Sequence, residues 1–480
     1  MLLLPLIFSA AGGACAFLIP KERPRNACVM GALILTFLSA AALCAADLPP
    51  LRLLSIGGGI ELTLFLDGVA RFFALLVSGV WMVVGPYAFP YIRHEGRPRR
   101  FFGFYMLTLA SLMGLCLSGN AVTFYMFYEL MTLLSIPLVL HSGAETAIYA
   151  SLKYLGYSVL GASMALFGLF ILASYGGAAG FAPGGILDAS RTAGHEEMLV
   201  RVWLLMSLGF GCKAGMVPLQ AWLPTAHPAA PSPASAVLSG LITKAGVLGI
   251  LRVTYFVFGP EMLRGTSAQH ILLGLALLTV LTGSMLAYKE RPFKRRLAFS
   301  TVSQVSYALF GLFLLTPGGV LGALLQVFFH AVAKNVLFLA AGAMIFRTGR
   351  VNAEDYQGIG REMPVTTWCF AISALSLIGI PPTGGYFSKW YLATSAMESC
   401  GALGMLGAAI LLLSALLTAG YLLPVVARGF FPGRDYVPRK QEVGPAMCAP
   451  MVILAAAAAL CGLISGPLAG PVAAIAASVF

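Results

Sequence analysis

Residues 213–251 read KAGMVPLQAWLPTAHPAAPSPASAVLSGLITKAGVLGIL, and this stretch decides the fold class. It places two lysines, Lys213 and Lys244, inside apolar segments of membrane length. A charge near the centre of a bilayer is costly, so such residues usually belong to ion or proton pathways. Pro218 should break the first segment, because proline removes a backbone donor and clashes with the preceding turn. A broken helix is tolerated inside a membrane only where protein buries it or where it lines a cavity.

The rest of the chain has the same apolar character. Of its 480 residues 59% are hydrophobic and 10% are charged, which excludes a soluble globular protein. Runs of about 20 apolar residues recur from end to end, each long enough to cross a bilayer as a helix. The first run lacks a basic start, so we interpret it as a span and not as a signal peptide. We count about fourteen runs, at 1–20, 26–46, 66–90, 101–118, 120–140, 148–174, 200–223, 233–258, 268–288, 297–315, 319–346, 365–394, 401–427 and 446–475. The sequence therefore predicts an all-α polytopic protein with a single membrane domain over 1–480.

The net charge of +12 indicates topology and does not indicate a nucleic-acid partner. If the N-terminus lies outside, the inner loops of a fourteen-span protein hold nineteen Lys and Arg residues and the outer loops hold four. Basic residues gather in the loops on the inner side of a membrane. We therefore expect a multi-pass protein of the cell's inner (cytoplasmic) membrane, in contact with lipid, with both termini on the outer side.

Two helix breaks suggest an internal duplication. The second break is predicted at Pro381 and Pro382, just before Lys389, so the breaks fall in the seventh and twelfth spans. An offset of five spans places the two copies in opposite orientations, as in inverted-repeat transporters. We therefore expect four parts: N-terminal helices 1–3 over 1–92, a first five-helix repeat over 101–258, a second inverted repeat over 268–427, and a C-terminal helix 14 over 446–480.

Glu129 and Lys213 form the first candidate pair. Glu129 lies in the apolar segment AVTFYMFYELMTLLSIPLVL. A nearby carboxylate favours the charged form of a buried lysine, whereas burial alone favours the neutral form. A pair whose separation varies is therefore a proton switch, and the alternative is a static ion pair that holds helices together. Lys244, deep in the next span, is the natural next acceptor, although a lysine can also extend its charge to the interface.

His330 and Lys334 form the second candidate group. They are four residues apart in FFHAVAKNVLF, so they share one helix face. An imidazole that titrates near neutral pH suits a proton relay, and packing near the helix start is the alternative for His330. Lys389 follows the second break, where outward exit is expected. His227 lies at the inner end of the seventh span and is either an entry group or a loop histidine.

Two further polar features have structural alternatives. A polar patch in the tenth span either holds water between Lys244 and Lys389 or forms helix–helix hydrogen bonds. It comprises Ser300, Thr301, Ser303, Gln304 and Ser306. Asp67 and Arg71 are spaced to pair across one helical turn.

Several motifs are missing from the sequence. It has no Walker A loop, no GxGxxG after a strand and no metal-ligand cluster. None of its nine cysteines has CxxC spacing, which argues against a zinc or iron–sulfur site. We therefore expect the chain to bind no nucleotide, metal or redox cofactor.

Six motifs together resemble a known family. They are LDGVARFFALLVSGV (66–80), FYMFYELMTLLSIPLVL (124–140), the stretch quoted above, RRLAFSTVSQVSYALFGL (295–312), HAVAKNVLFLAAGAMI (330–345) and IGIPPTGGYFSKWYL (378–392). The chain resembles the antiporter-like subunits shared by respiratory complex I, Mrp-type sodium/proton antiporters and energy-converting membrane-bound hydrogenases. The segment HPAAPSPAS is most similar to the Mrp D-type and hydrogenase-associated branch.

The resemblance, which covers about residues 60–430, implies a fold and a set of roles. It implies fourteen helices in two inverted five-helix repeats, with the seventh and twelfth helices discontinuous. It also assigns the fifth-helix glutamate, the seventh-, eighth- and eleventh-helix lysines and the twelfth-helix exit residue to Glu129, Lys213, Lys244, Lys334 and Lys389.

The sequence leaves four functions to compare. The first is a proton-translocating subunit coupled to redox chemistry in partner subunits, which would make the whole complex an oxidoreductase. The second is a subunit of an Mrp-type sodium/proton antiporter without redox partners. A stand-alone secondary transporter is the third, and a structural membrane scaffold is the fourth. The first two imply other membrane subunits as partners, including further antiporter-like subunits, and protons or sodium as the transported ion.

Overall fold

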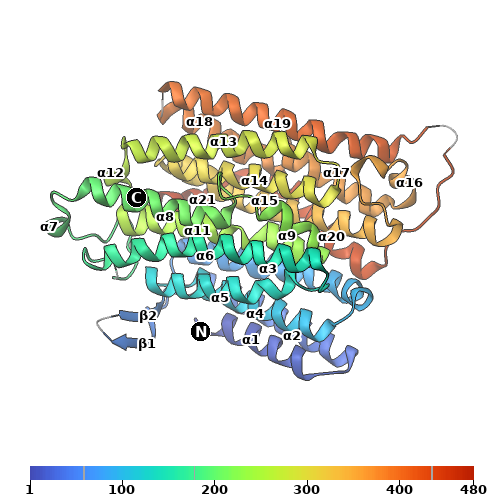
Figure 1. Ribbon diagram of the computed structural model, residues 1–480, viewed down its shortest axis with the longest axis horizontal. Coiled ribbons are helices and arrows are strands. Elements are labelled where there is room, and N and C mark those ends of the chain that lie inside the picture. Colours follow the sequence, from blue (N-terminus) through green and yellow to red (C-terminus); the bar gives the residue numbers. More distant parts are fainter. Residues whose placement is uncertain (58–59, 178, 400, 434–435) are drawn as a thin grey trace.

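The chain folds into a bundle of helices that run side by side along the long axis of the molecule (Figure 1). The computed structural model describes residues 1–57, 60–177, 179–399, 401–433 and 436–480. One end of the bundle carries a β-hairpin and the short helix α7 (Ala189–Thr192), and both chain ends lie toward this end (Figure 1). The short helix α16 (Ile359–Glu362) lies at the other end.

Long helices account for the N-terminal part of the chain. They are α1 (Leu4–Leu18), α2 (Glu22–Cys44), α3 (Gly68–Glu95), α4 (Pro98–Cys116), α5 (Ala121–Val139) and α6 (Glu145–Ala173). Asn120 caps α5 by accepting a hydrogen bond from the Thr123 backbone amide, which satisfies one of the free donors at the start of the helix.

The helix that contains Lys213 is broken, as the sequence predicted. The helix α8 (Glu196–Ala214) ends at Gly215, whose φ of +85° favours glycine. The chain crosses Pro218 without helix and resumes as α9 (Leu223–Ala229). The next segment contains two π-helical turns. It consists of α10 (Ser232–Val237), η1 (Leu238–Ile242), α11 (Lys244–Leu251) and η2 (Arg252–Phe258), followed by the short α12 (Pro260–Leu263).

The second half of the chain repeats this pattern of long helices with one break. It contains α13 (Ser267–Lys289), α14 (Phe293–Phe313), α15 (Pro317–Thr348) and the short η3 (Ala353–Asp355). The broken helix consists of α17 (Pro364–Ile378) and α18 (Gly384–Ser399), so the second predicted break is confirmed as well. The chain ends with α19 (Gly401–Phe430), α20 (Pro445–Leu463) and α21 (Ser465–Ser478).

The prediction of an all-α polytopic membrane protein is confirmed. Within the described residues, nine helices are long and apolar enough to cross a membrane by length and composition. Each of the fourteen predicted ranges contains helix, in some cases as two shorter pieces. The count of fourteen spans and the division into two inverted repeats stay predictions.

A two-stranded antiparallel hairpin is the main addition to the predicted fold. Its strands are β1 (Leu51–Gly57) and β2 (Ile60–Leu64), with Leu51 opposite Leu64. The segment LRLLSIGGGIELTL contains a glycine run between two apolar stretches, which is a signal for a turn between strands.

The predicted pairing of Asp67 with Arg71 is wrong. Asp67 is the N-cap of α3, where its carboxylate accepts a hydrogen bond from the Ala70 amide. A residue at the N-cap precedes the helical surface, so the one-turn spacing does not bring its side chain to Arg71. Asp67 instead makes two bonds with the buried guanidinium of Arg252, including one of 2.9 Å from Nη2 to Oδ1.

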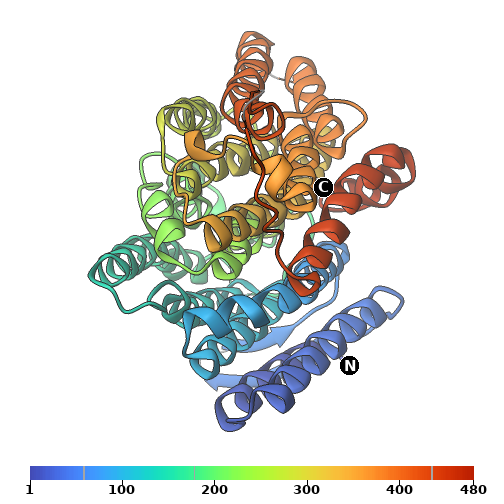
Figure 2. The ribbon, with the colours of Figure 1, turned by 90° about the vertical axis from the view of Figure 1, so that its right-hand side faces the viewer.

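Two segments form the core of the bundle. The segment Ser232–Phe258 is wholly buried in the protein and α15 is almost wholly buried, whereas α6 and α19 are mostly exposed. Figure 2 looks along the helices and shows the N-terminal helices in blue at one edge, the green middle part next, and orange helices at the opposite edge. The C-terminal α20 returns to pack against both α3 and α15. The two buried segments carry Lys244, His330 and Lys334.

Candidate functional site

Lys213 lies in the last turn of α8, where the broken helix ends. Its Nζ donates to Thr132 Oγ1 at 2.8 Å, Tyr154 OH at 2.9 Å and Ser158 Oγ at 3.1 Å. The same atom lies 4.5 Å from the centre of the Tyr154 ring. The carboxyl end of a helix favours a positive charge, and an aromatic ring face does so too. The buried ammonium therefore has three hydroxyl acceptors and a favourable ring.

Glu129 lies on α5, one turn before Thr132. Its side chain is half-buried, and its Oε1 is enclosed without a hydrogen-bond partner. Among the described residues no ion pair within 4.0 Å joins it to Lys213, so Thr132 contacts the lysine in its place. The neighbouring Met126, Leu130 and Leu133 are exposed on the same helix. Glu129 therefore borders a surface of the protein that faces outward.

Lys244 and His330 are in direct contact. Lys244 Nζ lies 2.6 Å from His330 Nδ1 and donates to the Ser239 carbonyl at 2.6 Å. Ser239 belongs to the π-helical turn η1, and such turns are frequent at functional sites. Both side chains are buried, and the second ring nitrogen of His330, Nε2, is enclosed without a partner. The arrangement suits proton exchange at Nδ1, with Nε2 as the second proton-carrying atom of the ring.

Lys334 lies one turn after His330 on α15, and the polar patch of α14 connects it to Lys244. Its Nζ donates to the Leu297 carbonyl at 2.9 Å and to the Ser300 hydroxyl. The next residue, Thr301, shares a hydrogen bond of 2.7 Å with the Ser239 hydroxyl. The residue whose carbonyl binds Lys244 is therefore bound through its hydroxyl to the α14 patch.

A second set of polar contacts runs from the centre toward the other break. Gln326 lies one turn before His330, and its amide donates to the Gln304 backbone carbonyl and Oε1, both at 3.1 Å. The Ser388 hydroxyl donates to Gln326 Oε1 at 2.7 Å. Ser388 directly precedes Lys389, so these buried groups occupy the space between His330 and the α17–α18 break.

Lys389 closes the end of the broken helix. Its Nζ donates to the carbonyls of Leu377 and Ile378 at 2.6 and 2.7 Å, in the last turn of α17. The ring of Tyr307 lies 5.1 Å away. The last carbonyls of a helix have no partner within the helix and carry partial negative charge. Lys389 and Lys213 thus both lie at the carboxyl end of a half-helix.

His227 is buried in the interior and does not lie in an exposed loop. It belongs to α9, and its ring lies 4.9 Å from that of Phe338. Neither of its ring nitrogens has a hydrogen-bond partner in the structure. Lys334, Lys294 and Lys244 are its charged neighbours. Its position is suited to contact with ordered water, since a buried imidazole normally has hydrogen-bond partners.

The lysines share one type of environment. Within the described part of the chain, Lys213, Lys244, Lys334 and Lys389 form no ion pair, and hydroxyls, carbonyls and one imidazole bind them. The described residues also contain no cluster of three or more His, Cys, Asp or Glu side chains that would hold a metal ion. These groups can bind and release protons, and their partners can accept or donate hydrogen bonds in either state.

Sequence reasoning missed several residues that contact the lysines. Tyr154 and Ser158 lie one turn apart in the mostly apolar α6, and both bind Lys213. Gln326 lies four residues before His330 and eight before Lys334, on one helix face. A search for polar residues at a spacing of four in these apolar segments would have found all three.

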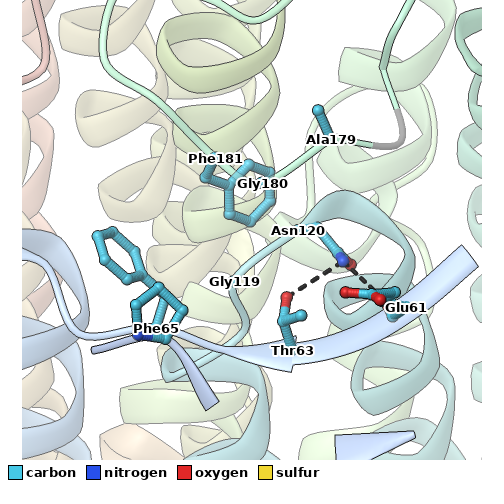
Figure 3. Close-up of a pocket in the computed structure, with 9 residues that line it drawn as sticks. Glu61, Thr63, Phe65, Gly119, Asn120, Ala179, Gly180 and Phe181 are labelled. Atoms are coloured by element: carbon cyan, nitrogen blue, oxygen red, sulfur yellow. Dashed lines mark hydrogen bonds between the residues drawn. The ribbon is translucent and has the colours of Figure 1, made fainter. Parts of the chain in front are cut away.

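One polar cavity lies outside this group of residues. It has a volume of about 340 Å³ and is lined by parts of the hairpin, the start of α5 and the segment around Phe181 (Figure 3). Asn120 donates to the Glu61 carbonyl at 2.7 Å and to Thr63 Oγ1 at 3.1 Å. These bonds join the hairpin to α5 and leave the amide with no free donor for a ligand.

Comparison with known proteins gives a consistent result. A family model described as NADH:quinone oxidoreductase/Mrp antiporter, TM matches residues 118–418. The chain is 34% identical over 380 residues to NADH-quinone oxidoreductase subunit N of Desulforudis audaxviator, covering 78% of this chain and 74% of the relative. It is 32% identical over 432 residues to hydrogenase-4 component B of Escherichia coli. That alignment covers 84% of this chain and 62% of the relative.

The solved structures agree on the fold. A chain of the Mrp complex from a Dietzia species superimposes with a TM-score of 0.85 at 22% identity. The superposition covers 99% of this chain and 97% of the other. At this identity the similarity shows the fold alone.

Proposed function

Because the chain belongs to the NADH:quinone oxidoreductase/Mrp antiporter transmembrane family, we propose that this antiporter-like membrane subunit translocates protons through its buried lysines. The observation that carries the proposal is the contact between Lys244 and His330, with Lys334 and Gln326 on the same helix as His330. Titratable groups in a wholly buried segment are costly to maintain without a function.

Entry from the inner side is supported by an open cavity of about 700 Å³ between α6 and α9. Thr225 lines this cavity and accepts a hydrogen bond of 3.1 Å from Lys153. Tyr154, the next residue of α6, binds Lys213. A proton that enters here reaches Lys213 after few transfers, and His227 on α9 offers a second acceptor closer to Lys334.

Transfer through the centre uses the two nitrogens of His330. When Lys244 donates a proton to Nδ1, the ring becomes an imidazolium that can release a proton from Nε2. Water near Gln326 and Ser388 would carry this proton to Lys389, from which it leaves on the outer side. Lys334 shares the charge of the central group through Ser300 and Thr301.

Glu129 is proposed to couple this pathway to a neighbouring membrane subunit. An intramembrane carboxylate that borders an outward-facing apolar surface requires a partner that covers it. A charge that moves in the partner subunit would draw Glu129 toward or away from Lys213. The Glu129–Lys213 separation would then control whether Lys213 holds its proton.

The identity of the complex has two candidates. The sequence similarity to NADH-quinone oxidoreductase subunit N and to hydrogenase-4 component B favours a redox complex, in which other subunits carry the cofactors. The full-length agreement in fold with a chain of an Mrp complex favours a sodium/proton antiporter subunit. Mass spectrometry of the proteins that co-purify from native membranes separates the two, because only the first contains cofactor-bearing subunits.

A Lys244→Met variant tests the function itself. Methionine retains a similar volume and removes the titratable group, so we expect the complex to assemble and proton translocation in inverted membrane vesicles to fall at least tenfold. Lys289→Met is the matched control, because Lys289 is exposed at the end of α13. Unchanged translocation in the assembled Lys244→Met complex would remove Lys244 from the pathway.

A further inference from the structure

We propose that a hollow between α2, α3, α15, α20 and α21 binds one acyl chain of an anionic glycerophospholipid, whose phosphate is held by Arg71. We call this hollow the α3 groove. It has a volume of about 560 Å³ and contains none of the candidate proton-carrying residues. Its lining includes Phe37, Leu75, Val83, Phe328, Ile453 and Val472.

The length of the α3 groove fits an acyl chain. Along α3 its lining runs from Arg71 in the first turn to Val83. Twelve residues at the helical rise correspond to roughly 18 Å. The hydrocarbon core of a bilayer is about 30 Å thick, so the groove extends through slightly more than one leaflet. It begins at the end of the bundle that carries the hairpin (Figure 1).

The charge at the mouth of the groove fits a phosphate. Arg71 is the only charged residue that lines the α3 groove in the part of the chain that the structure describes. Its Nη2 donates to the Ala46 carbonyl at 2.7 Å and lies 4.0 Å from Asp47, which is fully exposed. Nε has no partner, and about one third of the side chain is exposed. A guanidinium with unused donors binds phosphate well, and an exposed carboxylate at 4.0 Å competes weakly.

The inner end of the groove reaches the helix that carries the central histidine. Phe328 and Val332 line the α3 groove, and His330 lies between them in the sequence and contacts Lys244. Phe328 is half-buried, whereas the residues on either side of it in α15 are buried. An acyl chain at this place would exclude water from the side of α15 that faces away from Lys244 and so prevent leakage of protons into the bilayer.

Photo-crosslinking tests the site in the intact complex. The complex is reconstituted with phosphatidylglycerol or phosphatidylcholine that carries a diazirine in one acyl chain, and labelled peptides are identified by mass spectrometry. We expect α3 and α21 peptides of the groove to be labelled several-fold more strongly by phosphatidylglycerol. Arg71→Gln should abolish this preference, whereas Arg52→Gln, which changes an exposed arginine of the hairpin, should preserve it.

A groove-filling variant tests the acyl chain separately. Gly79 lines the α3 groove, and a Cβ at this position would lie 3.3 Å from the Phe37 ring. Gly79→Leu should reduce labelling of the groove peptides at least threefold with both lipids, whereas Gly31→Leu on α2, where the added side chain meets open space, should not. Equal labelling by both lipids in the unmodified complex would overturn the headgroup assignment. Crosslinks from the groove to another subunit in place of lipid would overturn the site.

Discussion

At the scale of single residues, the lysines differ from the ion pairs that stabilise ordinary proteins. Lys213 and Lys389 are bound by hydroxyls and helix-end carbonyls, and Lys244 is bound by a carbonyl and a neutral imidazole. A carboxylate in direct contact would hold each lysine in its charged form. Neutral partners leave the charge of each lysine sensitive to the charges of its neighbours, which is what a relay of protons requires.

Arg252 and Asp67 show the opposite arrangement, and we predict that their role is structural. Arg252 is buried, makes two bonds with Asp67, and lies over the rings of Phe181 and Phe256 at 5.1 and 4.5 Å. Removal of one partner of a buried ion pair typically costs about 3–5 kcal/mol. We therefore expect Asp67→Asn to lower the Tm of the purified protein clearly, as measured by thermal unfolding in detergent.

The control for this prediction changes an ion pair of the surface. Arg201→Gln breaks the exposed pair with Glu197, and exposed pairs contribute about 0–1 kcal/mol, so its Tm should be almost unchanged. A fall in proton translocation for Asp67→Asn without a fall in Tm would contradict the structural assignment and would add Arg252 to the pathway.

At the scale of the helices, the two breaks position the ends of the pathway. Each break follows a glycine with positive φ, Gly215 or Gly379, and each contains proline. The half-helices α8 and α17 end within the bundle, so their last carbonyls are available to bind other groups. The break thereby provides negative partial charge inside the membrane without introducing a carboxylate.

The second break gives a prediction at this scale. The α18 helix approaches α17 closely at Gly385, where an added Cβ would lie 1.8 Å from the Ser376 carbonyl oxygen. Gly385→Ala should therefore displace α18 and separate Lys389 from the carbonyls of Leu377 and Ile378. We expect proton translocation to fall at least fivefold in vesicles that contain normal amounts of the complex.

Gly466→Ala is the matched control for Gly385→Ala. Gly466 lies in α21, and its added Cβ meets no atom within 4 Å. The two variants make the same chemical change in a helix and differ in the space available. Equal translocation by both would show that the close approach of α17 and α18 is not needed for the pathway.

At the scale of the whole molecule, the sequence predicted the fold better than the site. Hydrophobic runs and prolines are local properties, so the helical segments and both broken helices could be predicted from residues such as Pro218 and Pro382. The contact of Lys244 with His330 joins residues 86 positions apart, and it depends on how the two buried segments pack. The pairing of Asp67 with Arg252, 185 positions away, could not be predicted for the same reason.

The orientation of the molecule in the membrane gives the last prediction. Both chain ends lie toward the hairpin end of the bundle (Figure 1), and nineteen of thirty basic residues fall in loops that we assign to the inner side. Basic loops remain on the inner side of the membrane, so the hairpin end should face outward. A C-terminal alkaline phosphatase fusion should therefore be active and a C-terminal green fluorescent protein fusion dark. A fusion after Arg97 should give the opposite result. If the C-terminal fusion reported an inner location instead, the cavity beside Thr225 would open to the outer side, and Lys389 would become the entry residue and Lys213 the exit residue.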